Sequence, residues 1–329
     1  MSLVLGLDGG GTKTVCLLMD DNGQVLGRGE AGASNYQSVD IQTAFCSIQS
    51  AIAQAIASHH AVKIEAICLG LAGVDRPADI QVAHNLVQQL QSSQDISVTW
   101  ELSSSNVLIC NDAAIALVGG LGYPAGIVAI AGTGSIIFGR NYQGRTKRVG
   151  GWGYMLGDEG SAYHIAIQGM RAALRAYDGR EESTILQERL LQHLGLASLE
   201  DLITVVYQRG WGVKEIAALA PIVDRAALEG DQVANSIIEQ AVRELVKATQ
   251  VVIDDLFSRT EKVEIVTTGS VWQSLSKLRD KFADGIISIA PLAKVIYPRY
   301  EPAYGAGLLA LNTLGISHRA YAEDMPQHS

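Results

Sequence analysis

The chain has 329 residues, 48% of them hydrophobic and 18% charged, which is enough to form the cores of two domains or of one large domain. A net charge of −9 without any basic run argues against a nucleic-acid-binding surface, and no apolar run approaches the roughly 18 residues of a membrane span. Four scattered cysteines without a C-x-x-C pair, and a first predicted strand that begins after two residues, favour a cytoplasmic protein with reduced thiols and no signal peptide.

The first predicted elements form a meander of three strands, over residues 3–7, 15–19 and 24–29. Asn22 and Gly23, between the second and third strands, are a strong hairpin signal. The glycine-rich segment between the first and second strands is therefore a strand-to-strand turn and does not open a helix. The P-loop and the dinucleotide-binding fingerprint both require a helix at that point, so neither pattern applies.

That turn nevertheless carries groups that suit a phosphate. Glycines let the backbone come close to a ligand, and their N–H groups can form an anion-binding concavity. The flanking carboxylate and hydroxyl make phosphate binding a better interpretation than a glycine-rich hairpin alone. The candidate residues of this turn are Asp8, Gly10, Gly11, Thr12 and Lys13.

The rest of the first half predicts helices over 39–58, 79–91 and 113–117, and strands over 64–71 and 106–110. Asn35, in the loop after the meander, has both a donor and an acceptor for a ligand hydroxyl or amide. Asp112 follows a strand, and ligands gather at the carboxyl ends of strands in open α/β sheets. The Asp112 carboxylate suits two roles equally: it can cap the next helix, or accept a proton from a hydroxyl that attacks phosphorus.

A second strand–turn–strand unit begins the second half. Residues 127–131 and 136–139 are predicted strands, and the turn between them holds Thr133, Gly134 and Ser135. Its glycines and hydroxyls are similar in kind to those of the first turn, which favours a phosphate role over a plain hairpin. Two similar half-folds that face each other would place one such turn on each side of a bound nucleotide.

The glycine-rich segment 150–161 precedes a predicted helix over 161–178. So many glycines cost entropy on ordering, which a purely structural loop rarely needs, and Asp158 can accept hydrogen bonds from sugar hydroxyls.

Gly269 and Ser270 form either a site for adenine or ribose or an ordinary strand-to-helix turn, and Ala218 could give a flat surface for a base. The remaining predicted elements are helices over 198–207, 232–257 and 304–314 and a strand over 263–267.

Together these motifs resemble those of the N-acetylglucosamine kinase branch of the actin-like ATPase and sugar-kinase superfamily, the BadF/BadG/BcrA/BcrD-type ATPase group. The matching segments lie in family order over most of the chain, and the glycine-rich block after residue 150 is the most specific. They are Asp8–Thr12, Ser34–Asn35, Asn111–Ala114, Gly132–Ser135, Gly151–Ser161 and Gly269–Trp272.

The resemblance implies an α/β fold with two RNase H-like domains that face each other across a nucleotide cleft. It also implies ATP, Mg²⁺ and transfer of the γ-phosphate to the 6-hydroxyl of an amino sugar. Asp112 matches the catalytic base, and Asp8 matches a contact to Mg²⁺ through water. On the ATP side the resemblance implies Gly10, Gly11, Thr12, Lys13, Thr133, Gly134, Ala218, Gly269, Ser270 and Ser274. On the sugar side it implies Asn35, Asp112, Ser135, Gly151, Trp152, Gly153 and Asp158.

We therefore expect an N-acetylglucosamine kinase, cytoplasmic and homodimeric, with no nucleic-acid or membrane partner. Its first domain would span residues 1–118, completed by a C-terminal helix over 310–329, and its second would span 119–309. A kinase for glucosamine or a muramic acid derivative, and a non-catalytic ATP- and sugar-binding sensor, are the alternatives. The scattered cysteines do not suit the iron–sulfur cluster of dehydratase activators in the same group, and an actin-like filament protein would not explain residues 150–161.

Overall fold

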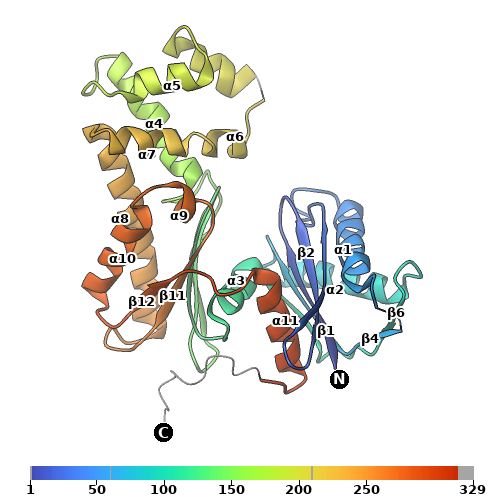
Figure 1. Ribbon diagram of the computed structural model, residues 1–329. Coiled ribbons are helices and arrows are strands. Elements are labelled where there is room, and N and C mark those ends of the chain that lie inside the picture. Colours follow the sequence, from blue (N-terminus) through green and yellow to red (C-terminus); the bar gives the residue numbers. More distant parts are fainter. Residues whose placement is uncertain (1, 60, 209, 318–329) are drawn as a thin grey trace. The chain divides into compact units, whose positions relative to one another are not determined.

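The computed structural model describes residues 2–59, 61–208 and 210–317 (Figure 1). Its contacts divide the chain into two compact units. The first unit comprises Met1–Gly126, Asn141–Gly144 and Pro298–Ser329, and the second comprises Ile127–Arg140 and Arg145–Tyr297.

These divisions differ from the expected boundaries at 118 and 310. Helix α3 (Asp112–Leu121) continues past residue 118 until Gly122, whose left-handed φ of 82° ends it, so the first unit extends further. The last helix, α11 (Pro302–Thr313), begins earlier than residue 310 and belongs to the first unit. Residues 318–329 of the expected C-terminal helix lie outside the described residues.

The first unit is built on a five-stranded sheet with the order β3-β2-β1-β5-β7. The expected antiparallel meander is confirmed, and two further strands extend it in parallel from β1. The strands are β1 (Leu3–Gly9), β2 (Thr14–Asp20), β3 (Val25–Ala31), β5 (Ala66–Leu71) and β7 (Val107–Asn111).

The strand predicted over 64–71 is in fact two strands in two sheets. β4 (Val62–Ile64) pairs in parallel with β6 (Val98–Trp100), a strand that the sequence pattern did not indicate. Glu65 separates β4 from β5, and its N–H donates to the Leu3 carbonyl at 3.0 Å. The single predicted strand therefore hides a change of partner strand at Glu65.

Helices cover both faces of this sheet. α1 (Ile41–Ile56) and α2 (Pro77–Ser92) bury apolar side chains against one face, in a core that includes Leu5, Leu69 and Leu86. α3 and α11 pack closely together on the other face (Figure 1). A Cβ on Gly305 would lie 2.2 Å from the Ile115 carbonyl oxygen, so this packing of α11 on α3 requires glycine.

The second unit repeats this strand pattern in its own sheet, β10-β9-β8-β11-β12, which again runs third, second, first, fourth, fifth in chain order. The expected strand–turn–strand unit and the later strand are present, and the edge strands β10 and β12 were not predicted. The strands are β8 (Gly126–Ala131), β9 (Ser135–Arg140), β10 (Thr146–Gly150), β11 (Glu264–Thr268) and β12 (Lys294–Ile296).

The long helix α8 (Gln232–Leu256) confirms the prediction over 232–257 and packs on β9, β10 and α10 (Leu278–Ile289). α4 (Ala162–Tyr177) also lies where predicted, and it contacts three shorter helices near one end of the unit (Figure 1). These are α5 (Leu186–Leu194), α6 (Val213–Ala217) and α7 (Ala220–Leu228). A short helix, α9 (Val271–Ser274), follows β11.

The helix predicted over 198–207 is present, but in an irregular form. The segment forms a 3₁₀ helix, Leu199–Asp201, and a π-helix, Thr204–Gln208. The Ser198 hydroxyl and the Asp201 carboxylate each accept a backbone N–H of the first turn, and the β-branched residues that follow disfavour a regular α-helix.

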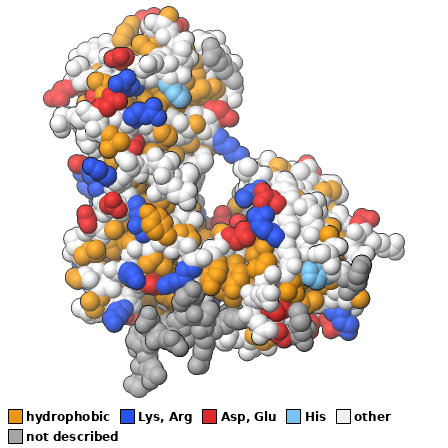
Figure 2. Space-filling model, in the orientation of Figure 1, with side chains coloured by type: hydrophobic (Ala, Val, Ile, Leu, Met, Phe, Trp, Pro, Cys, Tyr) orange, Lys and Arg blue, Asp and Glu red, His pale blue; other side chains and the backbone are white. Residues whose placement is uncertain are grey.

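On the face that Figure 2 shows, basic and acidic side chains are intermixed on both units. Among the residues that the structure describes, no helix is both long and apolar enough to cross a membrane.

Candidate functional site

Strand register brings three loops of the first unit to one edge of its sheet. Gly9 of β1 pairs with Leu71 of β5, and Leu71 pairs with Asn111 of β7, so these parallel strands end in one row. The loops that follow them are the glycine-rich turn, the segment 72–76 and the start of α3 with Asp112. This is the edge where ligands collect in open α/β sheets.

The glycine-rich turn is joined directly to the Asn35 loop. The Gly10 N–H donates to the Lys13 carbonyl at 2.9 Å, which closes the turn. The Gly10 carbonyl accepts the N–H groups of Ser34 and Asn35 at 3.0 and 3.1 Å. Gly11 and Thr12 are exposed at the tip. The structure therefore brings the predicted phosphate-binding turn and the predicted sugar-binding asparagine together within one unit.

Asp112 is the first residue of α3, but it is not the residue that caps it. The Asn111 side-chain oxygen accepts the Ala114 N–H at 3.0 Å and so acts as the N-cap. Of the two roles that suit an aspartate here, the helix cap is therefore filled by its neighbour. Asp112 stands in the first turn of α3, at the positive end of the helix dipole.

Asp8 lies near enough to Asp112 for the two charges to interact. The pKa of Asp8 is raised to about 7, first by burial and then by the Asp112 and Glu301 carboxylates, whereas Lys13 opposes the rise. Like charges that are held together in a partly dehydrated place favour protonation or a nearby cation. The pair therefore fits a hydrated Mg²⁺, although no cluster of three or more carboxylate, histidine or cysteine ligands occurs among the described residues.

In the second unit, the turn with Thr133 is fastened to the start of α4. The Gly132 N–H donates to the Gly134 carbonyl at 2.9 Å, and the Ala162 N–H donates to the Gly132 carbonyl at 2.8 Å. Gly269 lies against the same turn with a φ of 111°, and a Cβ there would lie 2.3 Å from the Ala131 carbonyl oxygen. Only glycine fits this approach, which brings Ser270 beside the turn.

Ser274 belongs to the same group through α9. Its N–H and its hydroxyl donate to the Ser270 carbonyl at 2.8 and 2.7 Å. Ala218 does not join them: it is the exposed C-cap of α6, and no hydrogen bond among the described residues links it to the segment from Gly269 to Ser274. Its adenosine contact stays a prediction.

Asp158 connects the glycine-rich loop to the Thr133 turn. It is 8% exposed, and its carboxylate accepts the backbone N–H groups of Gly153 and Ser135. Burial raises its pKa, and these two hydrogen bonds oppose the rise. Its φ of 60° is unusual for a non-glycine residue. Strained backbone of this kind concentrates at functional sites, and the two hydrogen bonds hold the carboxylate between two candidate segments.

Trp152 is the most prominent exposed ring of this loop, with 69% of its surface accessible. The Arg148 guanidinium lies 4.8 Å from the ring centre and donates through Nε to the Gly150 carbonyl at 3.2 Å. Arg148 on β10 therefore supports the glycine-rich loop through the Trp152 ring and the Gly150 carbonyl. The sequence pattern gave no sign of this, because β10 was not recognised as a strand.

The sequence analysis also missed the segment after β5. The Asp75 carboxylate accepts the Asn111 side-chain N–H at 2.9 Å, directly beside Asp112. The signal was present, because a predicted strand ending at residue 71 places the next residues on the same sheet edge as the other candidate loops.

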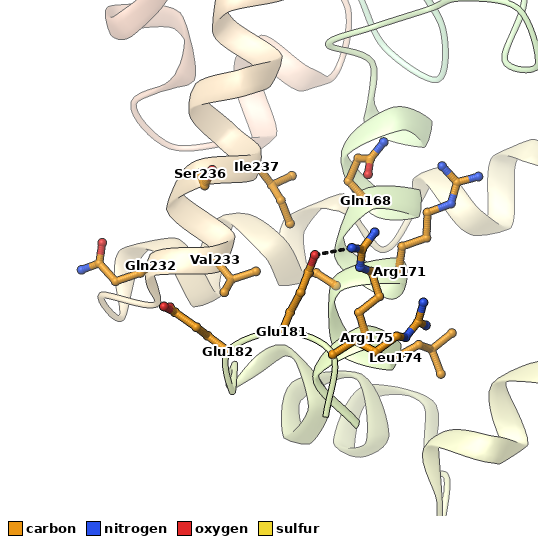
Figure 3. A pocket seen from close by; sticks show the side chains of 12 residues that line it. Gln168, Arg171, Leu174, Arg175, Glu181, Glu182, Gln232, Val233, Ser236 and Ile237 are labelled. Atoms are coloured by element: carbon orange, nitrogen blue, oxygen red, sulfur yellow. Dashed lines mark ion pairs between the residues drawn. The ribbon is translucent and has the colours of Figure 1, made fainter. Parts of the chain in front are cut away.

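A cavity of about 680 Å³ in the second unit lies apart from every candidate residue (Figure 3). α4 contributes Arg171 and Arg175, and the first turns of α8 contribute Gln232 and Ser236. The Arg175 guanidinium pairs with Glu181 at 2.6 Å. A second cavity of about 370 Å³ does include candidates, among them Ser135 and Trp152.

Comparison with known proteins agrees with this architecture. Both units have the RNase H-like fold of actin-like ATPases and sugar kinases. Two solved structures with a similar fold are a candidate N-acetylglucosamine kinase from Chromobacterium violaceum and a ROK family glucokinase from Streptomyces griseus. The first structure is 26% identical, has a TM-score of 0.71 and covers 94% of this chain and 99% of that chain. The second, solved in complex with glucose and AMPPNP, is 16% identical and has a TM-score of 0.55. It covers 96% of this chain and 99% of that chain, and the likeness shows the fold alone.

The chain belongs to the BadF/BadG/BcrA/BcrD ATPase family, whose model matches residues 5–310. It is 36% identical to the N-acetylmuramic acid/N-acetylglucosamine kinase of Clostridium acetobutylicum, over 94% of this chain and 98% of that protein. It is 35% identical to the N-acetyl-D-glucosamine kinase of Dictyostelium discoideum, with the same coverage of 94% and 98%.

Proposed function

We propose that this protein is an ATP-dependent kinase that phosphorylates the 6-hydroxyl of N-acetylglucosamine. The observation that carries the proposal is similarity over nearly the whole chain to two proteins named as kinases of this sugar. The site agrees with it, because a carboxylate that does not cap its helix stands beside a phosphate-type glycine turn. A sugar or nucleotide sensor would need no such carboxylate.

Asp112 is assigned the role of general base. Its carboxylate would accept the proton of the 6-hydroxyl as that oxygen attacks the γ-phosphorus, and ADP would leave with the bridging oxygen. The N–H groups and hydroxyls at Gly11, Thr12 and Thr133 would stabilise charge on the phosphates, and Gly10, whose own N–H closes the turn, would let the backbone come close to them. Lys13 adds a positive charge beside the turn.

The remaining candidates are assigned to the two ligands. Sugar hydroxyls and the acetamido group would be held by Asn35, Ser135, Gly151, Trp152, Gly153 and Asp158. The nucleotide would be held by Gly134, Gly269, Ser270, Ser274 and Ala218. Mg²⁺ would be held through water by Asp8 and would neutralise charge on the phosphates.

The test is Mg·ATP-dependent ADP release with N-acetylglucosamine, N-acetylmuramic acid, glucosamine, N-acetylmannosamine, glucose and no sugar. We expect the highest kcat/KM with N-acetylglucosamine, far above the rate without sugar. Equal rates with and without sugars would point to an ATPase and withdraw the proposal. A preference for N-acetylmuramic acid or glucosamine would keep the kinase and change its acceptor.

We also propose a cytoplasmic homodimer. ATP and reduced thiols are available in that compartment, and four cysteines stand free in the described chain. Sedimentation equilibrium at micromolar concentration would test the dimer, and a mass equal to one chain would exclude it.

A further inference from the structure

The buried carboxylate of Asp79 lies outside the candidate site but links loops that form the site. We propose that Asp79 is a positioning residue for the sugar: through Tyr36 it fixes the loop that carries Asn35. The inference rests on the proposed function, since it concerns how the acceptor sugar is held. Among the described residues, the hydrogen bonds of Asp79 side-chain oxygens go to Arg76 and Tyr36.

All the oxygen lone pairs of Asp79 are used within the first turn of α2 and by one distant residue. The Asp79 side chain is 5% exposed. One oxygen accepts the Arg76 N–H and Nε at 3.0 and 2.9 Å, and the other accepts Arg76 Nη2 at 3.0 Å and the Tyr36 hydroxyl at 2.5 Å. The Arg76 guanidinium, followed by the Tyr36 hydroxyl, holds the pKa of Asp79 well below its usual range. A charged acceptor makes these hydrogen bonds strong.

Tyr36 is the residue after Asn35, so its position limits where the Asn35 side chain can lie. The Asn35 side-chain oxygen accepts the Gln37 N–H at 3.0 Å, and Gln37 Nε2 donates to the Gly73 carbonyl at 2.7 Å. The Asn35 N–H is held by Gly10. The Asn35 loop is thus fastened at three points, to the glycine turn, to Gly73 and to Asp79.

The segment from Gly73 to Asp79 is also fastened to the base. Asp75 accepts the Asn111 side-chain N–H at 2.9 Å, and Asn111 caps the helix that begins with Asp112. One short segment therefore links the predicted sugar-binding asparagine with the predicted base. Small displacements between such groups cost large factors in rate or affinity, because the reacting atoms must be held within a narrow range of distances.

A structural role is the alternative, because the Asp79 carboxylate also accepts the N–H of Arg76, the N-cap residue of α2. The Tyr36 hydroxyl separates the two roles. Tyr36→Phe removes the link to the Asn35 loop and leaves every hydrogen bond between Asp79 and Arg76 in place. Tyr304→Phe is the matched control, since its hydroxyl donates to the Gly23 carbonyl at 3.1 Å in the same unit, away from these loops.

The experiment measures KM for N-acetylglucosamine at saturating ATP, KM for ATP at saturating sugar, and melting temperature, for the wild type and both variants. In Tyr36→Phe we expect the sugar KM to rise on the order of tenfold, as for a lost hydrogen bond to a charged group. The ATP KM and the melting temperature should stay close to those of Tyr304→Phe.

The inference is overturned if the sugar KM of Tyr36→Phe matches that of Tyr304→Phe, or if the KM values for sugar and ATP rise together. Asp79→Asn is the second variant, and its sugar KM should rise at least as much as that of Tyr36→Phe. Loss of sugar-dependent ADP release in the wild type would instead remove the proposed function, which is a separate result.

Discussion

The carboxylates of Asp8 and Asp112 interact at one edge of a single sheet. They come from β1 and from the residue after β7, and the strand register places these ends in one row. Burial and the charge of Asp112 together raise the pKa of Asp8 to about 7. A phosphate-transfer site uses such a pair when one carboxylate meets a hydrated cation and the other accepts a proton.

Asp112→Asn tests the base. The amide keeps the shape of the side chain but cannot accept the proton, so kcat with N-acetylglucosamine should fall by about 10²–10⁴-fold. The affinity for ATP, measured by titration calorimetry without sugar, should change less than threefold, on the order of a few tenths of a kcal/mol. Asp21→Asn, at an exposed hairpin, is the control. Wild-type turnover in Asp112→Asn would remove Asp112 from this role.

The raised pKa of Asp8 predicts that the free energy of unfolding depends on pH in the absence of nucleotide and metal. Its pKa is about 7 in the folded chain against a reference value of 3.8, so between these values the folded chain binds more protons than the unfolded chain. The free energy of unfolding should therefore fall as the pH rises from about 4 to about 7, by on the order of 1–3 kcal/mol from this group.

Urea unfolding of the wild type and Asp8→Asn at pH 5 and pH 8 measures this contribution. The stability of the variant relative to the wild type should increase at the higher pH, because the variant has no charge to bury. An equal change in both proteins would show that Asp8 titrates normally.

Gly134→Ala tests the placement of Asp158. A Cβ at Gly134 would lie 2.7 Å from the Asp158 Oδ2 atom, so the carboxylate must move. We expect the sugar KM to rise by about tenfold, in line with the cost of a displaced charged hydrogen-bonding group. Gly132→Ala is the control in the same turn, because the nearest atom to its Cβ would be 3.8 Å away. Similar sugar KM values in both variants would contradict a role for Asp158 in sugar binding.

Gly305→Ala tests the close packing of α11 on α3. The added Cβ would lie 2.2 Å from a backbone carbonyl oxygen of α3, which cannot turn aside. Overpacking of this kind typically costs about 1–3 kcal/mol, and the free energy of unfolding should fall accordingly. In Gly285→Ala the nearest atom is a side-chain carbon of Val246 at 2.7 Å, which can adjust, so a smaller loss is expected. Equal losses would show that α3 and α11 can separate at little cost.

The regular helices and strands were predictable because the hydrophobic pattern indicates them directly. The meander around Gly10, the turn at Thr133 and helix α8 each have an unambiguous period or turn signal. The short edge strands β6, β10 and β12 were not, because three to five residues carry too little pattern to separate a strand from a loop. The segment after Ser198 is helical as predicted, but it changes from a 3₁₀ turn to a π-helix, which the periodicity did not indicate.

The predicted site residues were chosen by chemistry and motif, and those choices omit residues that act through others. Asp79 has no motif of its own, and its partner Tyr36 lies far from it in the chain. Arg148 reads as a surface charge until β10 places it under Trp152. Positioning contacts of this kind depend on the tertiary fold and cannot be read from spacing.

The central claim is transfer of the ATP γ-phosphate to the 6-hydroxyl of N-acetylglucosamine. The direct measurement is incubation of the protein with Mg·ATP and N-acetylglucosamine, followed by mass spectrometry and ³¹P–¹H correlation NMR of the sugar. We predict one added phosphate, coupled to the protons on carbon 6, formed in a one-to-one ratio with ADP. Unchanged sugar with inorganic phosphate and ADP as the products, or phosphate on another hydroxyl, would contradict the account.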